Sequence, residues 1–512
     1  MFRTALVVPW MVDKYKKIEF NNREVMAIQI LGAILKEKGI ECDLYNAHAL
    51  RIANEELSDE LSVKDYDFIG ISCISQRSYK YAKELINMLR DKSCKSFIVL
   101  GGFYISTAFI KIIEDIPRLD CIIVGEGEES LPMMVENLSV GKSIYDIDGV
   151  VAYRNGELVI NEVKRICDLN KYPAPLRDFN IVSNKYTPVP YFRIFSGRGC
   201  YGRCSFCSTL QHIKIRRKIY RRAELVVQEM EDIVKKYNVN LFRFDDDIFY
   251  DLTDEGQKWV DDFVDDILYR NLKVKFDIEM RASDVREDIL LKLKSAGLYM
   301  ISIGAESGVD RILQEMRKDI TVQRTKDALE VIKKCGIITQ ITYIALVPTM
   351  TFEELKQSYD FLLEVGCYTE SNLYNRLNVY NACEYENILR EKGLLIEQTN
   401  FYERHGYIFA DDRVELFATF IGEIRNEFSI INDIITEKSQ LRKNTDALMN
   451  IIKDVSEKRK EIWIEVIKGL IKDIEENYEN NKEEIYNHFS NHKIDVIKRI
   501  SVIAQYLNAV NV

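Results

Sequence analysis

Three thiols within eight residues are the feature of this chain with the clearest chemistry. Cys200, Cys204 and Cys207 follow the spacing C-x3-C-x2-C, and the glycines around them let the backbone curl so that the sulfurs can converge. A structural zinc normally takes four protein ligands, and no second C-x2-C or H-x3-H lies nearby. An iron–sulfur cluster takes thiolates and does not need a protein ligand on every iron. We therefore predict a [4Fe–4S] cluster with one open iron; a zinc site and three unrelated core cysteines are the alternatives.

An aromatic residue, Phe206, precedes the third thiol. With it, the loop resembles the signature of radical S-adenosylmethionine (radical SAM) enzymes. The resemblance implies that the open iron binds the amino and carboxylate groups of S-adenosylmethionine. It also implies that the reduced cluster splits this ligand to a 5′-deoxyadenosyl radical, with the electron supplied by a flavodoxin- or ferredoxin-type donor.

Two motifs further along the chain resemble those that hold the amino acid part of S-adenosylmethionine in this family. Asp246 and Asp247 stand in an F-x-D-D-x-F segment, and either carboxylate is expected to accept from the ligand's ammonium group. Arg281 stands in the segment Met-Arg-Ala-Ser, where it is expected to pair with the ligand's carboxylate as a bidentate clamp. A single acidic residue after a strand is more often a cap or a surface group, so the signal lies in the order of the motifs.

Three later positions resemble the family's nucleoside contacts. Glu306 stands in a G-x-E-S-G segment, with Ser302 four positions before it, and Glu306 is expected to accept from both ribose hydroxyls. Lys318 falls at the place of the family's M-x-K turn. The chain departs from the usual G-x-P motif at Ala345–Pro348, so adenine contact there is expected to rely on the Val347 backbone.

The elements that must position these residues alternate between strand and helix. From about residue 191 to 400, apolar strand-like runs and helical patterns follow one another, which predicts a partial (β/α)6 TIM-type barrel. Barrel chemistry lies at the carboxyl ends of strands, and the thiol loop follows one such strand. The resemblance therefore covers a catalytic module over these residues.

Residues 1–145 show the same alternation with short links, which predicts a Rossmann-like, doubly wound parallel sheet. Ligands bind such sheets beyond the carboxyl ends of the strands. The segments at three of these ends, G-G-F-Y and G-E-G-E among them, resemble those of the cobalamin-binding domain that precedes many radical SAM modules. The positions expected to contact cobalamin are Ser72, Cys73, Gly101, Gly102, Phe103, Gly125, Glu126 and Gly127.

Two departures concern the cobalt ligand. His48 does not fit the D-x-H-x-x-G loop and follows the second strand, so we expect an ordinary loop or helix histidine. The G-G-x-H histidine is replaced by Tyr104, so cobalamin would have no protein histidine below the cobalt. A Rossmann-like domain that only packs on the barrel is the alternative.

The remaining chain reads as a linker and a helical tail. Residues 146–190 hold a hairpin signal at Asn155-Gly156 and half of the eight prolines, which predicts a stiff linker. Residues 401–512 carry amphipathic helical patterns without cysteine, which excludes a second cluster there. We expect a helical C-terminal region that caps the barrel or, alternatively, docks a peptide or protein substrate.

Composition bounds the partners. The chain has 512 residues, 30% of them charged, and a net charge of −10, which gives no general attraction for nucleic acid. The basic run at 214–222 is an exception that reads as a solvated helix start or as a contact for an anionic partner. Scattered cysteines, the lack of a signal peptide and the lack of a long apolar run predict a cytoplasmic protein without a membrane segment.

The combined prediction is a cobalamin-dependent radical SAM enzyme that methylates an unactivated carbon of a small-molecule or peptide substrate. A radical cyclase, rearrangement or redox enzyme without methyl transfer is one alternative. A non-catalytic iron–sulfur scaffold protein is the other.

Overall fold

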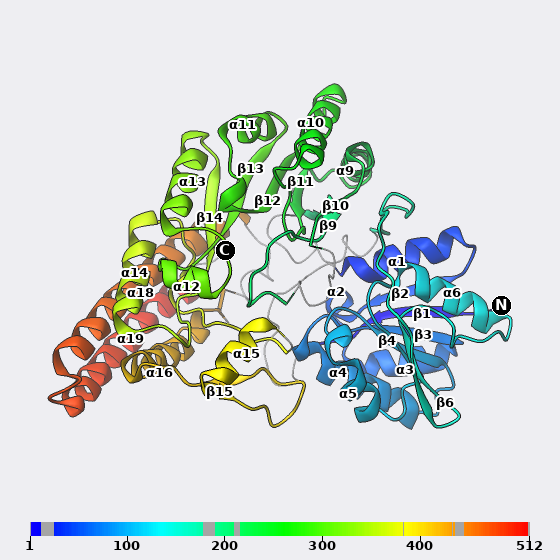
Figure 1. The fold of residues 1–512 in the computed structure, drawn as a ribbon, viewed down its shortest axis with the longest axis horizontal. Coiled ribbons are helices and arrows are strands. Elements are labelled where there is room, and N and C mark those ends of the chain that lie inside the picture. The colour runs from blue at the N-terminus through cyan, green and yellow to red at the C-terminus, as the bar shows by residue number, and fades with distance from the viewer. Residues whose placement is uncertain are drawn as a thin grey trace.

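The computed structural model describes residues 2–11, 25–177, 190–208, 216–381, 383–432, 434–435 and 445–509. It divides into an N-terminal α/β domain, a second α/β unit and a C-terminal helical region, which Figure 1 shows in blue to cyan, green, and yellow to red. The predicted fold class is confirmed. Residues 178–189 of the predicted linker and Lys214 of the basic run lie outside the described residues.

The N-terminal domain is built on one seven-stranded sheet of order β2-β1-β3-β4-β5-β6-β7. Its strands are β1 (Thr4–Val8), β2 (Cys42–Asn46), β3 (Phe68–Ser72), β4 (Phe97–Gly101), β5 (Cys121–Ile123), β6 (Val150–Arg154) and β7 (Glu157–Ile160). The first five strands are parallel, and all five residues of β1 are buried, as expected when helices cover both faces. This strand order is that of a doubly wound sheet.

Six helices connect the strands: α1 (Met26–Glu37), α2 (Ala47–Leu50), α3 (Asn54–Lys64), α4 (Gln76–Asp91), α5 (Ile105–Asp115) and α6 (Gly127–Ser139). The predicted hairpin at Asn155-Gly156 forms β6 and β7, and β6 pairs antiparallel with β5. Because this hairpin extends the sheet, the N-terminal domain reaches Ile160, and only the chain beyond it can act as a connection.

The second unit is a five-stranded parallel sheet of order β14-β13-β12-β11-β8. Its strands are β8 (Phe192–Ile194), β11 (Leu241–Phe244), β12 (Lys275–Arg281), β13 (Leu298–Glu306) and β14 (Ile338–Tyr343). Its outer helices are α9 (Ala223–Tyr237), α10 (Asp254–Tyr269), α11 (Glu287–Ser295), α12 (Asp310–Glu315), α13 (Val322–Lys334) and α14 (Phe352–Val365). The sixth strand that the predicted (β/α)6 barrel requires is reduced to a parallel bridge between Leu346 and Arg376.

A two-stranded ribbon, β9 (Gly197–Arg198) and β10 (Ile219–Tyr220), lies where the second unit approaches the N-terminal domain (Figure 1). The Tyr104 hydroxyl bonds to the Phe401 carbonyl at 3.1 Å, and the Gln76 side chain bonds to the Glu403 carbonyl at 3.1 Å. The chain that follows the barrel is therefore hydrogen-bonded to the N-terminal domain around Phe401.

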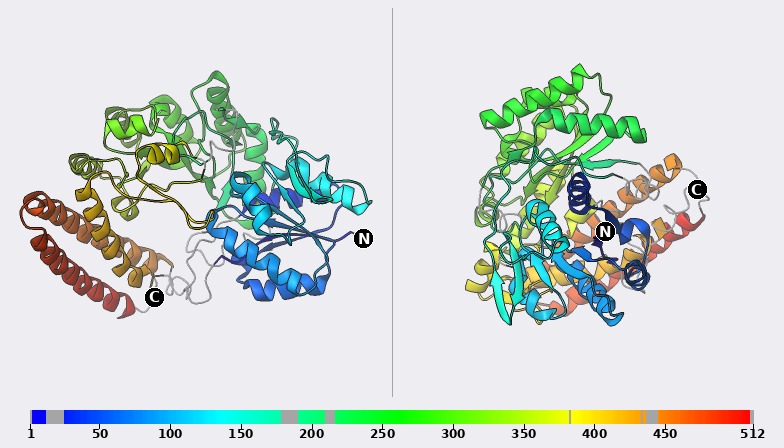
Figure 2. Two further views of the ribbon diagram at one scale, coloured as in Figure 1. Left: turned by 60° about the horizontal axis from the view of Figure 1, so that its bottom comes forward. Right: turned by 90° about the vertical axis from the view of Figure 1, so that its right-hand side faces the viewer.

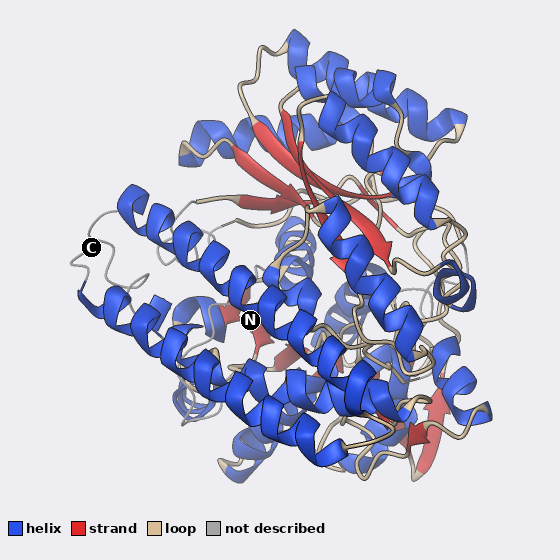
Figure 3. Cartoon of the chain, turned by 90° about the vertical axis from the view of Figure 1, so that its left-hand side faces the viewer, coloured by secondary structure: helices blue, strands red, loops and turns tan. Residues whose placement is uncertain are grey.

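The C-terminal region contains α15 (Glu384–Glu391), β15 (Leu395–Ile396), β16 (Gly406–Tyr407), α16 (Asp412–Glu427), α18 (Thr445–Asn477) and α19 (Lys482–Ala509). The two long helices α18 and α19 lie antiparallel along one side of the molecule (Figures 2 and 3). Their buried apolar residues join those of the barrel in one hydrophobic cluster. No helix within the described residues combines the length and the apolar character that a membrane crossing needs.

Candidate functional site

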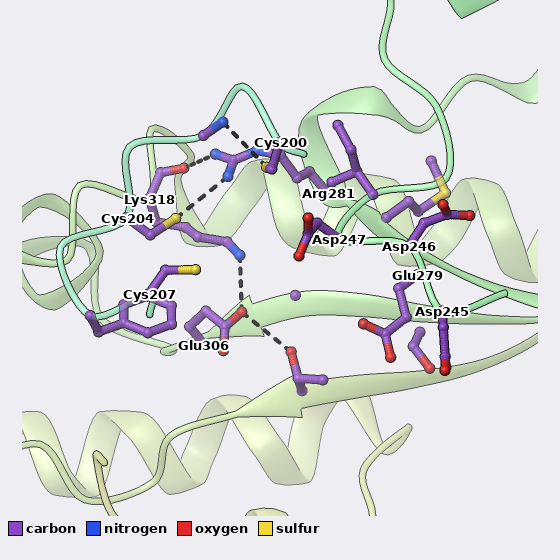
Figure 4. A pocket seen from close by; sticks show the side chains of 17 residues that line it. Cys200, Cys204, Cys207, Asp245, Asp246, Asp247, Glu279, Arg281, Glu306 and Lys318 are labelled. Atoms are coloured by element: carbon purple, nitrogen blue, oxygen red, sulfur yellow. Dashed lines mark hydrogen bonds and ion pairs between the residues drawn. The ribbon is translucent and has the colours of Figure 1, made fainter. Parts of the chain in front are cut away.

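A cavity of about 340 Å3 opens at the carboxyl ends of the second unit's strands. It is lined from β11, β12, β13 and β14 and from the thiol loop, so residues far apart in sequence meet there (Figure 4). The predicted site residues that line it are Cys200, Cys204, Cys207, Phe206, Asp246, Asp247, Arg281, Ser302 and Glu306. Lys318 lines it as well.

The three thiols lie on one wall of this cavity (Figure 4). Burial raises the pKa of the Cys200 thiol, although the Gly202 N–H, 3.3 Å from the sulfur, and the charge of Arg281 act in the opposite direction. Metal binding must therefore displace a proton from this thiol. Within the described residues, no three His, Cys, Asp or Glu side chains are arranged to hold a single metal ion. A cluster spreads its thiolates over separate irons, so its ligands need not meet at one point.

Asp246 holds the beginning of the thiol loop. Its carboxylate accepts from the backbone N–H groups of Ser196, at 3.0 Å, and Gly197, at 2.9 Å, and from the Ser196 hydroxyl. The ammonium group of Lys218 lies 3.3 Å from the same carboxylate, with both side chains almost fully buried. Burial lowers the pKa of Lys218, and Asp246 opposes this effect. Both oxygens of Asp246 thus have protein partners, which the motif did not indicate.

The neighbouring Asp247 accepts from the Gly199 N–H at 3.1 Å, and its side chain lines the cavity together with the thiols (Figure 4). On the far side of the loop, Ser205 donates its N–H to the Met316 carbonyl at 2.9 Å and accepts from the Tyr385 N–H at 2.9 Å. The thiol loop is therefore fixed on both sides before any cofactor binds.

Arg281 reaches the thiols from the end of β12. One terminal nitrogen donates to the Cys204 sulfur at 3.5 Å, and the other donates to the Lys318 carbonyl. Its Nε is buried and has no hydrogen-bond partner among the described residues, although the side chain lines the cavity. A buried donor without a partner is costly, so this nitrogen fits a ligand that brings an acceptor.

Glu306 ends β13 with a positive φ of 62°, at a point where the pairing with β14 shifts register. Its Oε1 accepts from Lys318 Nζ at 2.9 Å and from the Thr342 hydroxyl at 3.3 Å. Ser302 accepts from the Gln340 side chain at 3.0 Å. Strained positions of this kind concentrate at functional sites. Contact of these groups with a ribose stays a prediction.

Val347 is placed differently. It is fully buried, its N–H is directed to the Met350 sulfur at 3.4 Å, and it is not among the residues that line the cavity. Adenine contact through this backbone would therefore require a change in the segment that follows β14.

The second predicted site lies at the carboxyl ends of β3, β4 and β5. The Ser72 hydroxyl at the end of β3 is buried and has no hydrogen-bond partner in the part of the chain that the structure describes, whereas Cys73 is buried and bonded to Ser78 at 3.2 Å. A Cβ on Gly102 would lie 2.5 Å from the Cys73 carbonyl oxygen, and a Cβ on Gly125 would lie 2.5 Å from Val163. The chain's own packing thus requires these two glycines, whereas Gly101 has no such close neighbour.

The other residues predicted at this edge have distinct roles. Phe103 is 38% exposed, and Gly127 begins α6. Glu126 accepts from Arg198 at 3.0 Å and from the Ile166 N–H at 2.8 Å, so its carboxylate joins three segments. His48 lies in α2 and accepts from the Met11 N–H at 3.0 Å. Burial lowers the pKa of His48 to about 4. That His48 is an ordinary histidine stays a prediction.

Comparison with known proteins identifies both units. Residues 194–362 match the Radical SAM superfamily, and residues 23–135 match the B12 binding domain. The chain thus contains a radical SAM domain and a B12-binding domain. Its cofactors are accordingly a [4Fe–4S] cluster, S-adenosylmethionine and cobalamin.

Several curated proteins are similar to this radical SAM chain. The anaerobic magnesium-protoporphyrin IX monomethyl ester cyclase of Rubrivivax gelatinosus is 26% identical over 60% of the chain and 56% of its own length. An uncharacterised methyltransferase of Pyrococcus horikoshii is 24% identical over 70% of the chain and 78% of its own length. The chain spans about half the length of the Rubrivivax gelatinosus cyclase, at 56%, and of the same enzyme from Cereibacter sphaeroides, at 54%.

Two solved structures share the fold. The cobalamin-dependent S-adenosylmethionine radical enzyme OxsB has a TM-score of 0.77 at 18% identity, over 99% of this chain and 80% of that one. The radical S-adenosylmethionine methyltransferase TsrM of Kitasatospora setae has a TM-score of 0.64 at 16% identity, over 78% and 79% of the two chains. At these identities the likeness establishes the fold.

The residues of this radical SAM enzyme fit the cofactors that its domains imply. At the barrel, three thiols share a cavity with a buried Arg281 Nε for which the described residues supply no acceptor. At the N-terminal sheet, the buried Ser72 hydroxyl lies at the strand edge where doubly wound sheets bind ligands, and no described residue bonds to it. Both unpartnered polar atoms are groups that a bound cofactor can satisfy.

Sequence reasoning missed three residues that support or line the site. Lys218 and Arg221 belong to the basic run, yet both are buried in ion pairs, so neither reading of that run describes them. Glu279 lines the cavity opposite the thiols, and burial together with Asp245 raises its pKa. The position of Glu279 in β12, two residues before Arg281, was the available signal, because alternate residues of a strand share a face.

Proposed function

We propose that this protein is a cobalamin-dependent radical SAM methyltransferase that acts on an unactivated carbon of a small-molecule or peptide substrate. The observation that carries the proposal is the barrel cavity, in which three thiols, the buried Arg281 and the Lys318–Glu306 pair meet. An ion pair between Glu126 of the B12-binding domain and Arg198 links that domain to the thiol loop of this cavity.

When bound, the cluster with S-adenosylmethionine supplies a carbon-centred radical for hydrogen abstraction, and cobalamin supplies a methyl group. The chain's own residues hold and enclose the reactants. Cys200, Cys204 and Cys207 provide the thiolates for the cluster, and Arg281 presents positive charge beside them. The strand ends around the cavity keep the reacting groups in a restricted volume, which favours one orientation over competing reactions.

The similar proteins include methyltransferases and cyclases, so a radical cyclisation is the second candidate reaction. Methyltransferases of Pyrococcus horikoshii and Streptomyces wedmorensis favour methyl transfer, whereas the cyclases of Rubrivivax gelatinosus and Cereibacter sphaeroides favour a ring closure without it. A scaffold protein that does not turn over would fit less well, because the cavity retains charged groups beside the thiols. We place the enzyme in the cytoplasm, with a flavodoxin- or ferredoxin-type electron donor.

Anaerobic reconstitution tests the radical SAM activity. Protein loaded with iron and sulfide, then given dithionite and S-adenosylmethionine, should form 5′-deoxyadenosine. Cys204→Ala should abolish both the cluster absorbance and this product, whereas Cys335→Ala, a buried cysteine outside the cavity, should retain both. Wild-type protein that forms the cluster but no 5′-deoxyadenosine would favour the scaffold alternative.

Cobalamin binding and methyl transfer need separate measurements. After incubation with hydroxocobalamin and gel filtration, wild-type protein should retain a corrinoid spectrum, and Ser72→Val should retain less, because valine cannot supply the hydroxyl. Isotope-labelled S-adenosylmethionine distinguishes the two reactions. A labelled methyl group in the product supports methyl transfer, and a product without label supports the cyclase alternative.

A further inference from the structure

Arg198 connects the thiol loop to the N-terminal domain. It lies in β9, two residues before Cys200, and its guanidinium reaches two carboxylates of the other domain. One terminal nitrogen lies 3.0 Å from Glu126 Oε1, and the other donates to Glu128. Glu126 belongs to the turn between β5 and α6, and Glu128 belongs to the start of α6. Arg198 therefore links the thiol loop of the barrel to the segment after β5 in the N-terminal domain.

The geometry requires arginine. A planar guanidinium presents its N–H groups in a fixed fork and can engage two carboxylates at once, whereas a lysine ammonium is a single point charge. The Arg198 side chain is 27% exposed and that of Glu128 is 7% exposed, so water screens the contact only in part. Glu128 also lies in the first turn of α6, where the helix dipole favours a negative charge.

Each end of the contact is rigidly attached. Arg198 pairs with Ile219 in the β9–β10 ribbon, and the following Gly199 donates its N–H to the cavity residue Asp247. On the opposite side, Glu126 also accepts from the Ile166 N–H at 2.8 Å. A displacement of the turn after β5 would therefore be transmitted through Arg198 to the thiol loop.

We propose that Arg198 is a positioning residue that sets the spacing between the thiol loop and the cobalamin-facing turn after β5. The link is a property of the protein without cofactors. Its consequence for catalysis rests on the proposed function, because a methyl group and a radical can meet at one substrate carbon only if the two cofactor sites keep a fixed separation.

Hydrogen–deuterium exchange of the apoprotein tests the link directly. Arg198→Ala should speed amide exchange about tenfold in two segments, residues 125–129 and 197–204, and leave the barrel strands unchanged. Arg198→Lys should give an intermediate result in the same segments. The matched control is Arg270→Ala, which removes an arginine paired with two carboxylates, Glu231 and Asp266, on the barrel's outer helices.

Exchange at the wild-type rate in both segments of the Arg198→Ala protein would overturn the proposal. So would faster exchange throughout the barrel, because Arg198 would then support the fold as a whole. Arg198→Lys provides the same comparison if the alanine variant does not fold.

The reconstituted protein supplies a second readout. With both cofactors bound, the magnetic interaction between the reduced cluster and cobalt(II) should give a defined broadening of the EPR signals in wild type and in Arg270→Ala. In Arg198→Ala this broadening should become weaker and more heterogeneous, while 5′-deoxyadenosine still forms. Unchanged broadening in Arg198→Ala would contradict the proposal. Wild-type protein that binds no cobalamin would refute the proposed function alone, since the exchange experiment needs no cofactor.

Discussion

The side chain of Asp246 illustrates how one residue organises a site without any ligand. Two backbone N–H groups, a hydroxyl and the buried ammonium of Lys218 converge on its carboxylate. Lys218 itself lies over the rings of Tyr220 and Phe249, at 5.2 and 5.9 Å from their centroids. The start of the thiol loop therefore depends on one buried ion pair.

Asp246→Asn should destabilise the barrel. The change leaves the Lys218 charge buried without a counter-charge, and breaking a buried pair costs about 3–5 kcal/mol. Urea unfolding of the apoprotein measures this loss. Asp262→Asn is the matched control, because Asp262 pairs with Lys258 on the exposed face of α10 and such pairs contribute about 0.3–0.5 kcal/mol. Equal effects of the two substitutions would show that the Asp246 network is unimportant for stability.

At the scale of elements, the chain between the domains is fastened to α9. Arg177 and Arg221 both pair with Glu229, and all three side chains are buried. Burial by itself raises the pKa of Glu229, but the two arginines outweigh it and hold that pKa below its usual value. The segment that leaves the N-terminal sheet is thus fixed against the barrel by one carboxylate.

This carboxylate should make stability depend on pH. Because its folded-state pKa is depressed, Glu229 contributes stability above the unfolded-state value, about 4.3, and loses it as the pH falls through the folded-state value. Glu229→Gln should therefore lower the melting temperature most at pH 6–8 and progressively less below about pH 4. Thermal unfolding of both proteins across this range measures the difference.

Glu224→Gln is the control for this experiment, since Glu224 is exposed on the same helix and its 3.8 Å contact with Arg222 is also exposed. It should leave the melting temperature nearly unchanged at every pH. A Glu229→Gln deficit that stays constant from pH 8 to pH 3 would mean that the titration of this carboxyl does not drive the effect.

At the scale of the whole molecule, the C-terminal helices complete the barrel's core. Trp463 of α18 is fully buried, with its ring 5.1 Å from those of Phe428 and Tyr374 and its N–H bonded to Glu370 at 3.0 Å. Glu370 follows α14, so α18 packs on chain that belongs to the barrel. The helical region is therefore part of one hydrophobic core with the catalytic unit.

Trp463→Ala should destabilise the barrel together with the helices. Truncation of a buried tryptophan costs about 3–5 kcal/mol, because contacts are lost and a cavity remains. Thermal unfolding followed by circular dichroism should show one transition at a lower temperature. Tyr506→Ala, which removes a partly exposed ring from α19, should have a much smaller effect. A barrel transition at the wild-type temperature in Trp463→Ala would show that α18 is an independent module.

The sequence by itself determined the chemistry and the class of fold. The spacing of Cys200, Cys204 and Cys207 specifies a cluster loop, because three thiols within eight residues are typical ligands of an iron–sulfur cluster. Alternating apolar strands and helices specify parallel sheets because both faces must be covered. These signals are local, so they survive without knowledge of the packing.

The tertiary structure alone decided which polar groups face each other. Asp246 and Asp247 are adjacent in one motif, yet Asp246 binds Ser196 and Lys218 whereas Asp247 binds Gly199. Arg198 and Glu126 are 72 positions apart, and Tyr104 and Phe401 are 297 positions apart. Such contacts depend on how separate elements pack, so a local sequence pattern does not predict which side chains will be partners.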